Sequence, residues 1–534
     1  MEPAALCPRR GIMDAMPRRF AVLAAVMTLV LALTGAGQAH LERPVKFPSG
    51  KGSVPKYRKS GPLLLVCNAT SPRKIGGIRS DRIRRKNRRL LDRCRRKGFG
   101  NLQAAVNHVM RQKTRIKVLP GRYLEKPSKA PLSKACKKLK EEARPLSYLE
   151  ELSCPHVSNL VAVLGDGLDK GFACDRERLC HLQIEGTGAR PEDVIFDGKW
   201  NKHNIIRADR ADGFYIRNLT VQHAPDNGIY ILQSDGFVID RAVGRWTDSY
   251  GFLTFATDHG LYKYCEAYGN SDGGVYPGSA APHHGARPSV EIHHCNSHHN
   301  ALGYSGTAGN STYVHHNRFH HNTTGVTMDS LYPNHPGLPQ NSAVIVKNRI
   351  YSNNNDYYRF IRNGECDKPL KKRRNGVVCP RPPAPIGVGM LVAGGNANVF
   401  AQNWIYDNWR YGTMLFWAPA LIREEYSGEQ YDTSHFNRQL DNWMGRTKSG
   451  RERPNGLDFW WDEEGSGNCW EGNKSKGGAI TSDPATLPNC DQTPTFSPGN
   501  SEKHASILPC ATYDRKETPA PPGCDFMTKP PKPD

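Results

Sequence analysis

The 534-residue sequence predicts an all-β fold: a single-stranded right-handed parallel β-helix, with a short N-terminal capping helix and an irregular, disulfide-pinned C-terminal tail. Three observations lead to this prediction. A short motif recurs along the chain, brief stretches of alternating apolar residues flank its copies, and helical hydrophobic spacing is largely missing. The resulting solenoid would be one domain, and its loops would carry the function.

The recurring motif has six residues and ends in Asn. Copies begin at Cys265, Cys295, Asn317, Asn348 and Asn403, and the shortest period, from Cys295 to Asn317, is 22 residues. Strands this short cannot bury an apolar face alone, so they stack on copies of themselves. An Asn side chain can bond the turn backbone and its counterpart in the next coil. We therefore expect one inward-facing Asn ladder, with Cys265 and Cys295 in it and near enough for a disulfide.

Both ends of the stack can be located. Residues 101–107 read as a short amphipathic helix that covers the first coil, and residues 116–123 as the first strand. The Asn spacing recurs until about residue 480. Near that point the segment 458–464 and Trp470 combine aromatic and acidic residues. The rings are expected to seal the C-terminal end of the core, with a sugar-stacking role as the alternative.

The chain divides into four predicted segments. Arg18 and Arg19 precede an apolar run over residues 20–33 and a small-residue exit, so residues 1–39 read as a signal peptide. The run is shorter than a membrane span requires, and we expect no span in the mature protein. Residues 40–98 form a basic, poorly ordered arm, residues 99–480 the β-helix, and residues 481–534 the tail. The expected location is secreted, extracellular or associated with the cell envelope.

Cysteine usage agrees with export. Of the 15 cysteines, Cys7 falls in the signal region, which leaves an even number for an oxidising compartment. The nearest local pairs are Cys174 with Cys180 and Cys366 with Cys379, because each would close a short loop.

The charge is unevenly distributed. The formal net charge is +22, and residues 73–97 contain 13 Arg or Lys but only two acids. Such runs attract polyanions. For an exported monomer the expected partner is an anionic polysaccharide, with no nucleic acid. A solvated, flexible arm without a polyanionic partner is the alternative reading of this basic run, and in either case we expect residues 40–98 to pack little.

A family resemblance supports the fold. The helix followed by Val118-Leu-Pro-Gly-Arg-Tyr123, and then Ile184-Glu-Gly-Thr-Gly188 with Val194-Ile-Phe-Asp-Gly198, resembles the opening of the pectate-lyase-like superfamily of right-handed β-helices. The resemblance covers roughly residues 99–480. It implies the fold, and a superfamily that includes polysaccharide lyases, hydrolases, uronan epimerases and proteins without catalysis. It transfers no catalytic residue to this chain.

Two long insertions suggest where chemistry could occur. The loops 277–288 and 329–341 follow equivalent strands, with one short coil between them, so we expect them to frame a glycan groove about 10 Å wide. Its floor would consist of Ser305, Thr307 and Asn310. Carboxylates and imidazoles would serve as bases, acids or nucleophiles. The candidate catalytic residues are Asp258, His259, Asp329 and His335. The candidate substrate-binding residues are His283, His284, Arg287, Thr307, Asn310 and Tyr332.

These residues leave several functions open. The leading hypothesis is an extracellular protein that acts on or binds polysaccharide, as a lyase, epimerase or hydrolase. A non-catalytic envelope or matrix protein that binds anionic polymer is the alternative. No cofactor is implied with certainty, although Asp258 or Asp329 could hold Ca²⁺. A third reading is metal handling by the His pairs, which begin at His293, His298, His315 and His320 and should stack as ladders.

Overall fold

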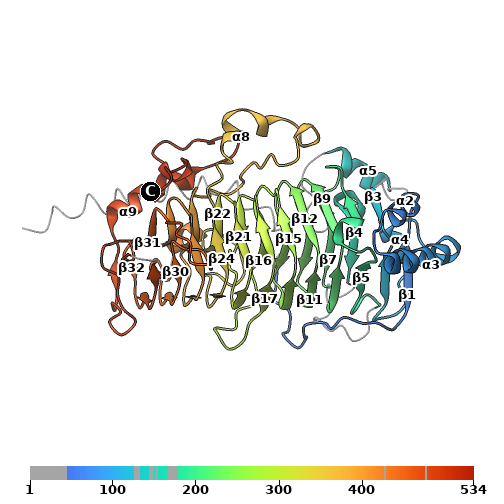
Figure 1. Ribbon diagram of the computed structural model, residues 1–534, viewed down its shortest axis with the longest axis horizontal. Coiled ribbons are helices and arrows are strands. Elements are labelled where there is room, and N and C mark those ends of the chain that lie inside the picture. Colours follow the sequence, from blue (N-terminus) through green and yellow to red (C-terminus); the bar gives the residue numbers. More distant parts are fainter. Residues whose placement is uncertain are drawn as a thin grey trace, which may run out of the picture.

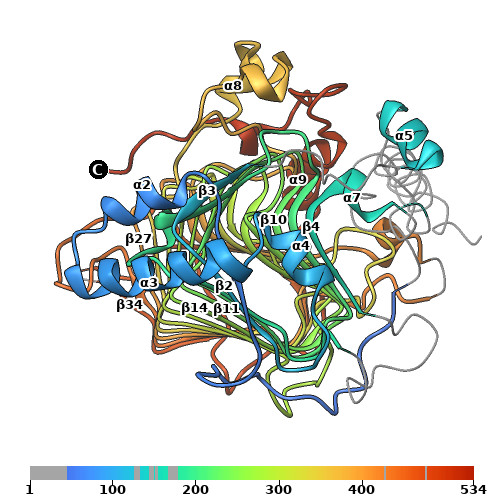
Figure 2. The same cartoon turned by 90° about the vertical axis from the view of Figure 1, so that its right-hand side faces the viewer.

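The computed structural model describes residues 45–124, 133–142, 150, 154–165, 178–425, 428–475 and 478–534. They form one elongated solenoid in which three parallel sheets run along the long axis (Figure 1). The chain passes from sheet A to sheet B to sheet C and then into the next coil. Viewed along the axis, the three sheets enclose one continuous core (Figure 2).

Each sheet takes one strand from each coil. Sheet A contains β1 (Leu63–Val66), β2 (Arg115–Val118), β5 (Gln183–Gly186), β8 (Phe214–Arg217), β11 (Asp235–Asp240), β14 (Asp258–Lys263), β17 (Val290–His293), β20 (Thr312–His315), β23 (Val344–Val346), β26 (Val399–Ala401), β29 (Arg438–Leu440) and β33 (Cys469–Glu471). Sheet B contains β3 (Gly121–Leu124), β6 (Val194–Asp197), β9 (Thr220–Ala224), β12 (Val243–Thr247), β15 (Glu266–Tyr268), β18 (Asn296–His298), β21 (Arg318–His320), β24 (Arg349–Tyr351), β27 (Trp404–Tyr406), β30 (Trp443–Met444) and β34 (Lys474–Ser475). Sheet C contains β4 (Asn159–Leu164), β7 (Asn204–Asp209), β10 (Asn227–Leu232), β13 (Phe252–Phe255), β16 (Gly273–Gly278), β19 (Leu302–Tyr304), β22 (Thr324–Asp329), β25 (Val388–Ala393), β28 (Tyr411–Phe416), β31 (Leu457–Trp461) and β35 (Ser482–Asp483).

The helices lie outside the coils or at their ends. They are α2 (Ser71–Gly76), α3 (Asp81–Lys97), α4 (Leu102–Asn107), α5 (Lys134–Glu141), α7 (Pro155–Ser158), α8 (Arg359–Arg362) and α9 (Ser501–Ile507), with short 3-10 turns at Pro191–Asp193, Glu365–Asp367, Leu370–Lys372, Ala420–Arg423, Leu508–Thr512 and Asp525–Met527. A small antiparallel pair, β32 (Glu464–Gly465) and β36 (Ser497–Pro498), joins the last coils to the tail.

Alternation within each strand builds the core. In sheet A, Phe214 and Ile216 pair in register with Phe237 and Ile239 of the next coil, and all four side chains are fully buried. Because successive side chains of a strand point to opposite faces, every second residue enters the core. Stacking identical positions makes that core continuous from coil to coil.

The predicted Asn ladder is confirmed. The backbone N–H of Asn317 donates to Oδ1 of Asn348 (2.9 Å), and that of Asn348 donates to Oδ1 of Asn403 (2.9 Å). Cys265 and Cys295 occupy the preceding rungs and form a disulfide, as their predicted proximity allowed. A second ladder of buried asparagines at the turn from sheet B to sheet C runs through Asn270, Asn300, Asn322, Asn353, Asn408 and Asn455.

The N-terminal region corrects one expectation. Residues 40–98 were predicted to pack little, yet the described part, from residue 45, is built into the fold: β1 pairs with β2, and Cys67 and Cys94 form a disulfide. Although α3 is strongly basic, Leu90 and Leu91 line one side of it and are buried against Leu65. An amphipathic stripe this narrow is enough to dock a helix whose other faces are charged.

The predicted capping helix is present as α4, with the Asn101 side chain accepting a hydrogen bond from the Ala104 N–H at its start. Leu102 and Val106 of α4 enter the core at the first coils. At the far end, Trp461 and Trp470 are buried in the same core with ring centroids 5.2 Å apart, so the aromatic segment does seal the stack.

The disulfides indicate an oxidising, extracytoplasmic location. The pairs with both partners described are Cys67–Cys94, Cys136–Cys154, Cys265–Cys295, Cys366–Cys379, Cys469–Cys490 and Cys510–Cys524. The predicted pair Cys366–Cys379 is confirmed. Cys180 is also disulfide-bonded, but its predicted partner Cys174 lies outside the described residues, as does the predicted signal peptide. Within the described ranges, none of the helices is both long and apolar enough to span a bilayer.

Candidate active site

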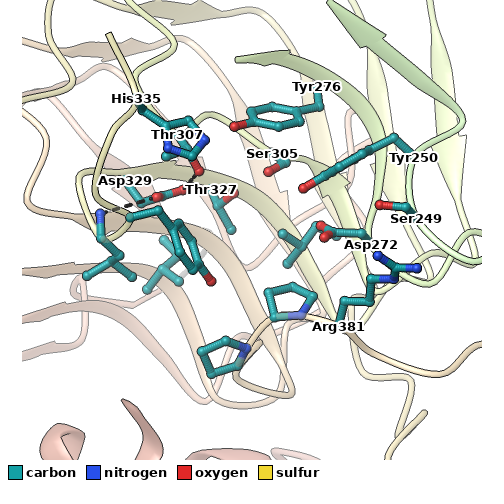
Figure 3. Close-up of a pocket in the computed structure, with 16 residues that line it drawn as sticks. Ser249, Tyr250, Asp272, Tyr276, Ser305, Thr307, Thr327, Asp329, His335 and Arg381 are labelled. Carbon is teal, nitrogen blue, oxygen red and sulfur yellow. Dashed lines mark hydrogen bonds between the residues drawn. The ribbon is translucent and has the colours of Figure 1, made fainter. Parts of the chain in front are cut away.

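The outer face of sheet C carries a polar pocket of about 80 Å³, which we call the sheet C pocket (Figure 3). Strands β16, β19, β22 and β25 form its floor. The loop 329–341 and the insertion 354–387, which carries α8, cover it from two sides. The pocket is lined by Ser249, Tyr250, Asp272, Tyr276, Leu302, Ser305, Thr307, Thr327, Asp329, Leu331, Tyr332, His335, Arg381, Pro382, Pro383 and Leu391.

Asp329 ends β22 and is 5 % exposed. Its Oδ2 accepts a hydrogen bond from the Thr307 hydroxyl at 2.9 Å, and its Oδ1 lies 3.4 Å from the Leu331 N–H. Burial, together with the charge of Asp272, raises the pKa of Asp329 to about 7. Near neutral pH this carboxyl group is therefore protonated in much of the population and can donate a proton.

Asp272 precedes β16 at the turn from sheet B and is 7 % exposed. Burial raises its pKa to about 6, and contact with the Tyr250 hydroxyl and the charge of Arg381 oppose a larger rise. The pocket thus holds two buried carboxyl groups whose pKa values both lie near neutrality. Asp272 loses its proton first, which leaves it as the base and Asp329 as the acid.

Three tyrosines surround the two carboxyl groups. The rings of Tyr250 and Tyr276 lie 4.7 Å apart, and Tyr332 of the loop 329–341 also lines the pocket. Burial and the neighbouring aspartates raise the pKa of each phenol well above its usual value. The phenols therefore stay protonated and can hydrogen-bond sugar hydroxyl groups, but they are poor proton acceptors.

Arg381 brings a cation to the pocket edge. Its Nη2 contacts Asp226 (3.2 Å) and Asp248 (3.5 Å), which occupy the same turn as Asp272 in earlier coils. Its Nε is buried and has no hydrogen-bond partner among the described residues. Burying a donor without a partner is costly, and an oxygen of a bound ligand could supply one.

Four of the predicted site residues line this pocket: Thr307, Asp329, Tyr332 and His335. The His335 ring is 6 % exposed and packs edge-on against Phe255, and burial lowers its pKa to about 4. Its imidazole is therefore neutral at physiological pH.

The other predicted residues lie at the neighbouring corner, where sheet C turns into sheet A. Asp258 is 1 % exposed and accepts two hydrogen bonds from Arg287 (2.8 and 2.7 Å), while His283 Nε2 lies 3.0 Å from it. His259 Nδ1 lies 2.7 Å from Asp235, whose carboxylate also accepts from the Gly52 N–H. The N-terminal segment therefore covers this cluster, and its charges are paired.

The two predicted loops do leave the same turn, but they do not frame an open groove. His284 of the first loop contacts Asn341 of the second, with 3.3 Å between His284 Nδ1 and Asn341 Nδ2. Asn310, the expected floor, is fully buried and bonds the Gly337 carbonyl and the Asn341 N–H. The two loops therefore contact each other, and the second loop also contacts the short coil between them.

The His pairs stack as predicted. Ring centroids of His293 and His315 lie 5.3 Å apart, and those of His298 and His320 lie 5.1 Å apart. In the described chain, the groups with three ligand atoms close enough for one ion are Asp235–Asp258–His259 and Glu425–Glu429–Asp432, and neither contains the stacked histidines.

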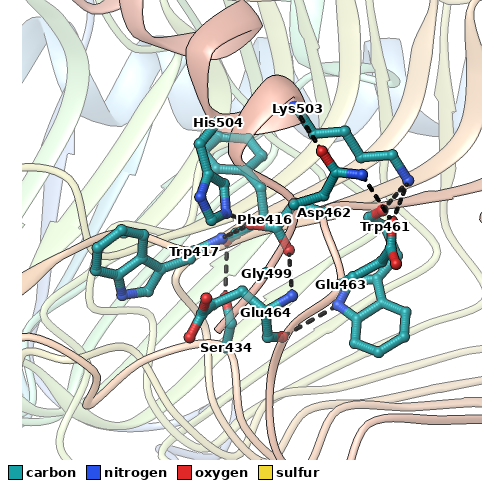
Figure 4. A network of polar contacts seen from close by, with 12 residues as sticks. Phe416, Trp417, Ser434, Trp461, Asp462, Glu463, Glu464, Gly499, Lys503 and His504 are labelled. Atoms are coloured by element: carbon teal, nitrogen blue, oxygen red, sulfur yellow. Dashed lines mark hydrogen bonds and ion pairs between the residues drawn. The ribbon is translucent and has the colours of Figure 1, made fainter. Parts of the chain in front are cut away.

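A second acidic cluster lies at the C-terminal end (Figure 4). Asp462 is fully buried and accepts hydrogen bonds from the Trp417 and Glu464 N–H groups, and His504 Nε2 lies 2.8 Å from it. Lys503 pairs with Glu463 at 3.1 Å. These contacts fasten α9 to the last coils, so the cluster holds the tail in place.

An apolar cavity of about 420 Å³ adjoins the sheet C pocket. The two share Leu331, Tyr332, Pro383 and Leu391, and the apolar walls continue through Phe416 and residues of the tail. Large sites of this composition commonly hold apolar parts of ligands.

Sequence reasoning did not find Asp272, Tyr250, Tyr276 or Arg381. One signal was present: Asp226, Asp248 and Asp272 recur at the same turn of successive coils. Arg381 could not be found in this way, because it lies in an insertion that folds back over earlier coils.

Residues 204–418 match the family described as the right handed beta helix region. They form a right-handed β-helix. No curated protein matches the sequence significantly. Among solved structures, the β-helix is similar to pectate lyase Pel9A, with 11% identity over 82% of this chain and 80% of the other (TM-score 0.34). It is similar to the A-module of the Azotobacter vinelandii mannuronan C-5 epimerase AlgE4, with 12% identity over 71% and 93% (TM-score 0.31). It is also similar to tailspike protein 3 of bacteriophage CBA120, with 10% identity over 70% and 46% (TM-score 0.36). These likenesses are too distant to identify a substrate or an activity.

Proposed function

We propose that the protein is an extracellular enzyme that hydrolyses a polysaccharide, with the sheet C pocket as its active site. The observation that carries this proposal is the pair Asp272 and Asp329, two buried carboxyl groups in one pocket with pKa values near 6 and 7. Glycoside hydrolysis uses one protonated and one ionised carboxyl group on either side of the scissile bond.

The assignment follows from which group ionises first. Asp329 donates its proton to the glycosidic oxygen as the bond from that oxygen to the anomeric carbon breaks. Asp272 takes a proton from the water that attacks the same carbon. Tyr250 and Tyr276 bind sugar hydroxyl groups, and Arg381 offers its unpartnered Nε to a substrate oxygen.

Elimination and epimerisation fit the pocket less well. Both need a base strong enough to remove a proton from carbon and a cation beside the resulting charge. The raised pKa values of the phenols keep them protonated, and Arg381 already faces two aspartates. Hydrolysis requires neither a base that can remove a proton from carbon nor a cation beside the resulting charge.

The test is a screen of the purified protein against uronans, glucans and cell-wall polymers, with and without Ca²⁺. Hydrolysis releases new reducing ends without the unsaturated product of a lyase. Asp272→Asn and Asp329→Asn should abolish turnover and keep substrate binding, whereas Asp258→Asn, in the paired cluster, should keep turnover. Turnover that survives both pocket substitutions would place the chemistry elsewhere.

A non-catalytic role in binding anionic polymer is the second candidate. The observation that favours it is α3, where ten of 17 residues are basic and only Asp81 and Asp92 are acidic. This candidate predicts no turnover of any glycan, and loss of retention on anionic polymer when the exposed α3 residues Arg85 and Arg89 are changed to Gln.

A further inference from the structure

A groove of about 750 Å³ runs along the corner where sheet A turns into sheet B. This corner faces away from sheet C in the view along the axis (Figure 2). We call it the A–B groove. It is separate from the sheet C pocket, and none of its lining residues belongs to that pocket.

One wall of the groove is a ladder that rises one coil at a time. The first residues of five successive sheet B strands pair in register: Arg318 with Arg349, Arg349 with Trp404, Trp404 with Trp443, and Trp443 with Lys474. Each coil therefore contributes a cation or an indole at the same position around the β-helix. Successive side chains are spaced about 4.8 Å apart along its axis. Such spacing is close to the length of one sugar unit in an extended glycan chain.

Exposed cations line the groove. Arg318, Lys347, Arg349, Lys448 and Lys474 line it, all are exposed, and none forms a salt bridge with another described residue. The one acid of the lining is Asp441. Like charges placed directly opposite each other on neighbouring strands destabilise a sheet, and Arg318 lies directly opposite Arg349. A bound polyanion would remove that repulsion.

The indoles position cations over the groove. Lys448 Nζ lies 5.2 Å from the Trp404 ring centroid, and Lys474 Nζ and the Arg446 guanidinium lie 5.1 and 4.0 Å from that of Trp443. These are cation–π distances. Nucleic acids bind such surfaces by stacking bases on exposed ring faces. Here cations occupy ring faces, which favours a polyanion without aromatic bases.

We propose that the A–B groove binds a linear anionic polysaccharide along the axis of the β-helix, at a surface distinct from the sheet C pocket. The extracytoplasmic location indicated by the disulfides places the chain where carboxylated or sulfated glycans occur. Because groove and pocket lie on different sides, the groove can hold polymer while the pocket is free. The proposal does not depend on catalysis in the pocket.

The test compares binding of polygalacturonate with binding of neutral dextran at low and moderate salt. Arg318→Gln combined with Arg349→Gln should weaken polygalacturonate binding about tenfold or more and flatten its salt dependence, since two charge-assisted contacts are lost. The matched control, Lys371→Gln with Lys372→Gln, removes the same charge from exposed residues in the insertion and should change affinity less than about threefold.

A second measurement needs no variant. Bound polygalacturonate should protect Lys347, Lys448 and Lys474 from chemical acetylation, and should leave Lys371 unprotected. The proposal is overturned if the groove variant binds polygalacturonate like the unaltered protein, or if these lysines are not protected. Tighter binding of single-stranded oligothymidine than of polygalacturonate would overturn it in favour of nucleic acid.

Discussion

Thr307 and Asp329 lie on neighbouring coils of sheet C, and the Thr307 hydroxyl donates a 2.9 Å hydrogen bond to Oδ2 of Asp329. This bond lowers the pKa of Asp329 and partly offsets the rise caused by burial. A hydroxyl of one coil therefore tunes the proposed acid of the next.

Thr307→Val tests this relationship. The hydrogen bond stabilises the ionised carboxylate, so its loss should raise the pKa of Asp329 further. The acid then stays protonated to higher pH, and the alkaline limb of the pH–rate profile should move to higher pH. Thr307→Ser, which keeps the hydroxyl, is the control and should leave that limb in place. An alkaline limb that stays fixed in Thr307→Val means that Asp329 is not the titrating acid.

The pH dependence of turnover should be bell-shaped. Activity should rise as Asp272 ionises near pH 6 and fall as Asp329 loses its proton near pH 7, with a maximum between these values. Initial rates across pH 4 to 9 on the identified glycan measure both limbs. Asp272→Asn and Asp329→Asn should each lower kcat by roughly 10²- to 10⁴-fold. A profile that keeps rising above pH 8 would contradict the assignment of Asp329 as the acid.

Glu464 should make the fold less stable as the pH rises. It is fully buried, neither carboxyl oxygen has a hydrogen-bond partner among the described residues, and burial with the charge of Asp462 raises its pKa to about 7. The folded state holds this proton more tightly than the unfolded state does. Stability is therefore greatest below the unfolded pKa, falls from about pH 4.5 to pH 7, and levels off above that.

Glu464→Gln should remove that loss. At pH 8 we expect it to raise the free energy of unfolding by about 3 kcal/mol, since the pKa of Glu464 is raised from 4.5 to about 7 and one pKa unit corresponds to about 1.4 kcal/mol, and at pH 4.5 to change it little. Thermal unfolding at the two pH values measures the difference. Glu463→Gln, which removes one of the two acidic partners of Lys503, should show no such gain at pH 8.

The Asn ladder should contribute measurably to stability. Asn348 accepts hydrogen bonds from Asn317 and donates to Asn403 Oδ1 and the Val314 carbonyl, and it is fully buried. Asn348→Ala would leave a buried N–H and a buried carbonyl without partners, so we expect a loss of about 2–4 kcal/mol in denaturant unfolding. Gln402→Ala, at an exposed residue of the same ladder turn, should cost less than about 0.5 kcal/mol.

The candidate site was predictable only in part. Asp329, His335, Thr307 and Tyr332 were found because a long insertion after a strand marks a working edge of a solenoid. Asp258 was chosen by the same reasoning, but Arg287 and His283 neutralise it and the N-terminal segment covers it. Loop positions can be inferred from a repeat, whereas the pairing of charges between loops depends on how those loops fold.

The sequence by itself determined the parallel β-helix. Asn317, Asn348 and Asn403 recur with one spacing, alternating strands lie beside them, and such strands can bury their apolar faces only by stacking. Local hydrogen bonding and periodicity specify that arrangement without knowledge of distant contacts. Tertiary structure alone decided that Arg381 and Asp272 share a pocket, because the insertion 354–387 folds back over coils more than a hundred residues earlier. The docking of α3 also depends on tertiary structure. Charged residues outnumber the apolar residues of this helix in the sequence, but the apolar residues pack against a matching apolar surface at the end of the solenoid.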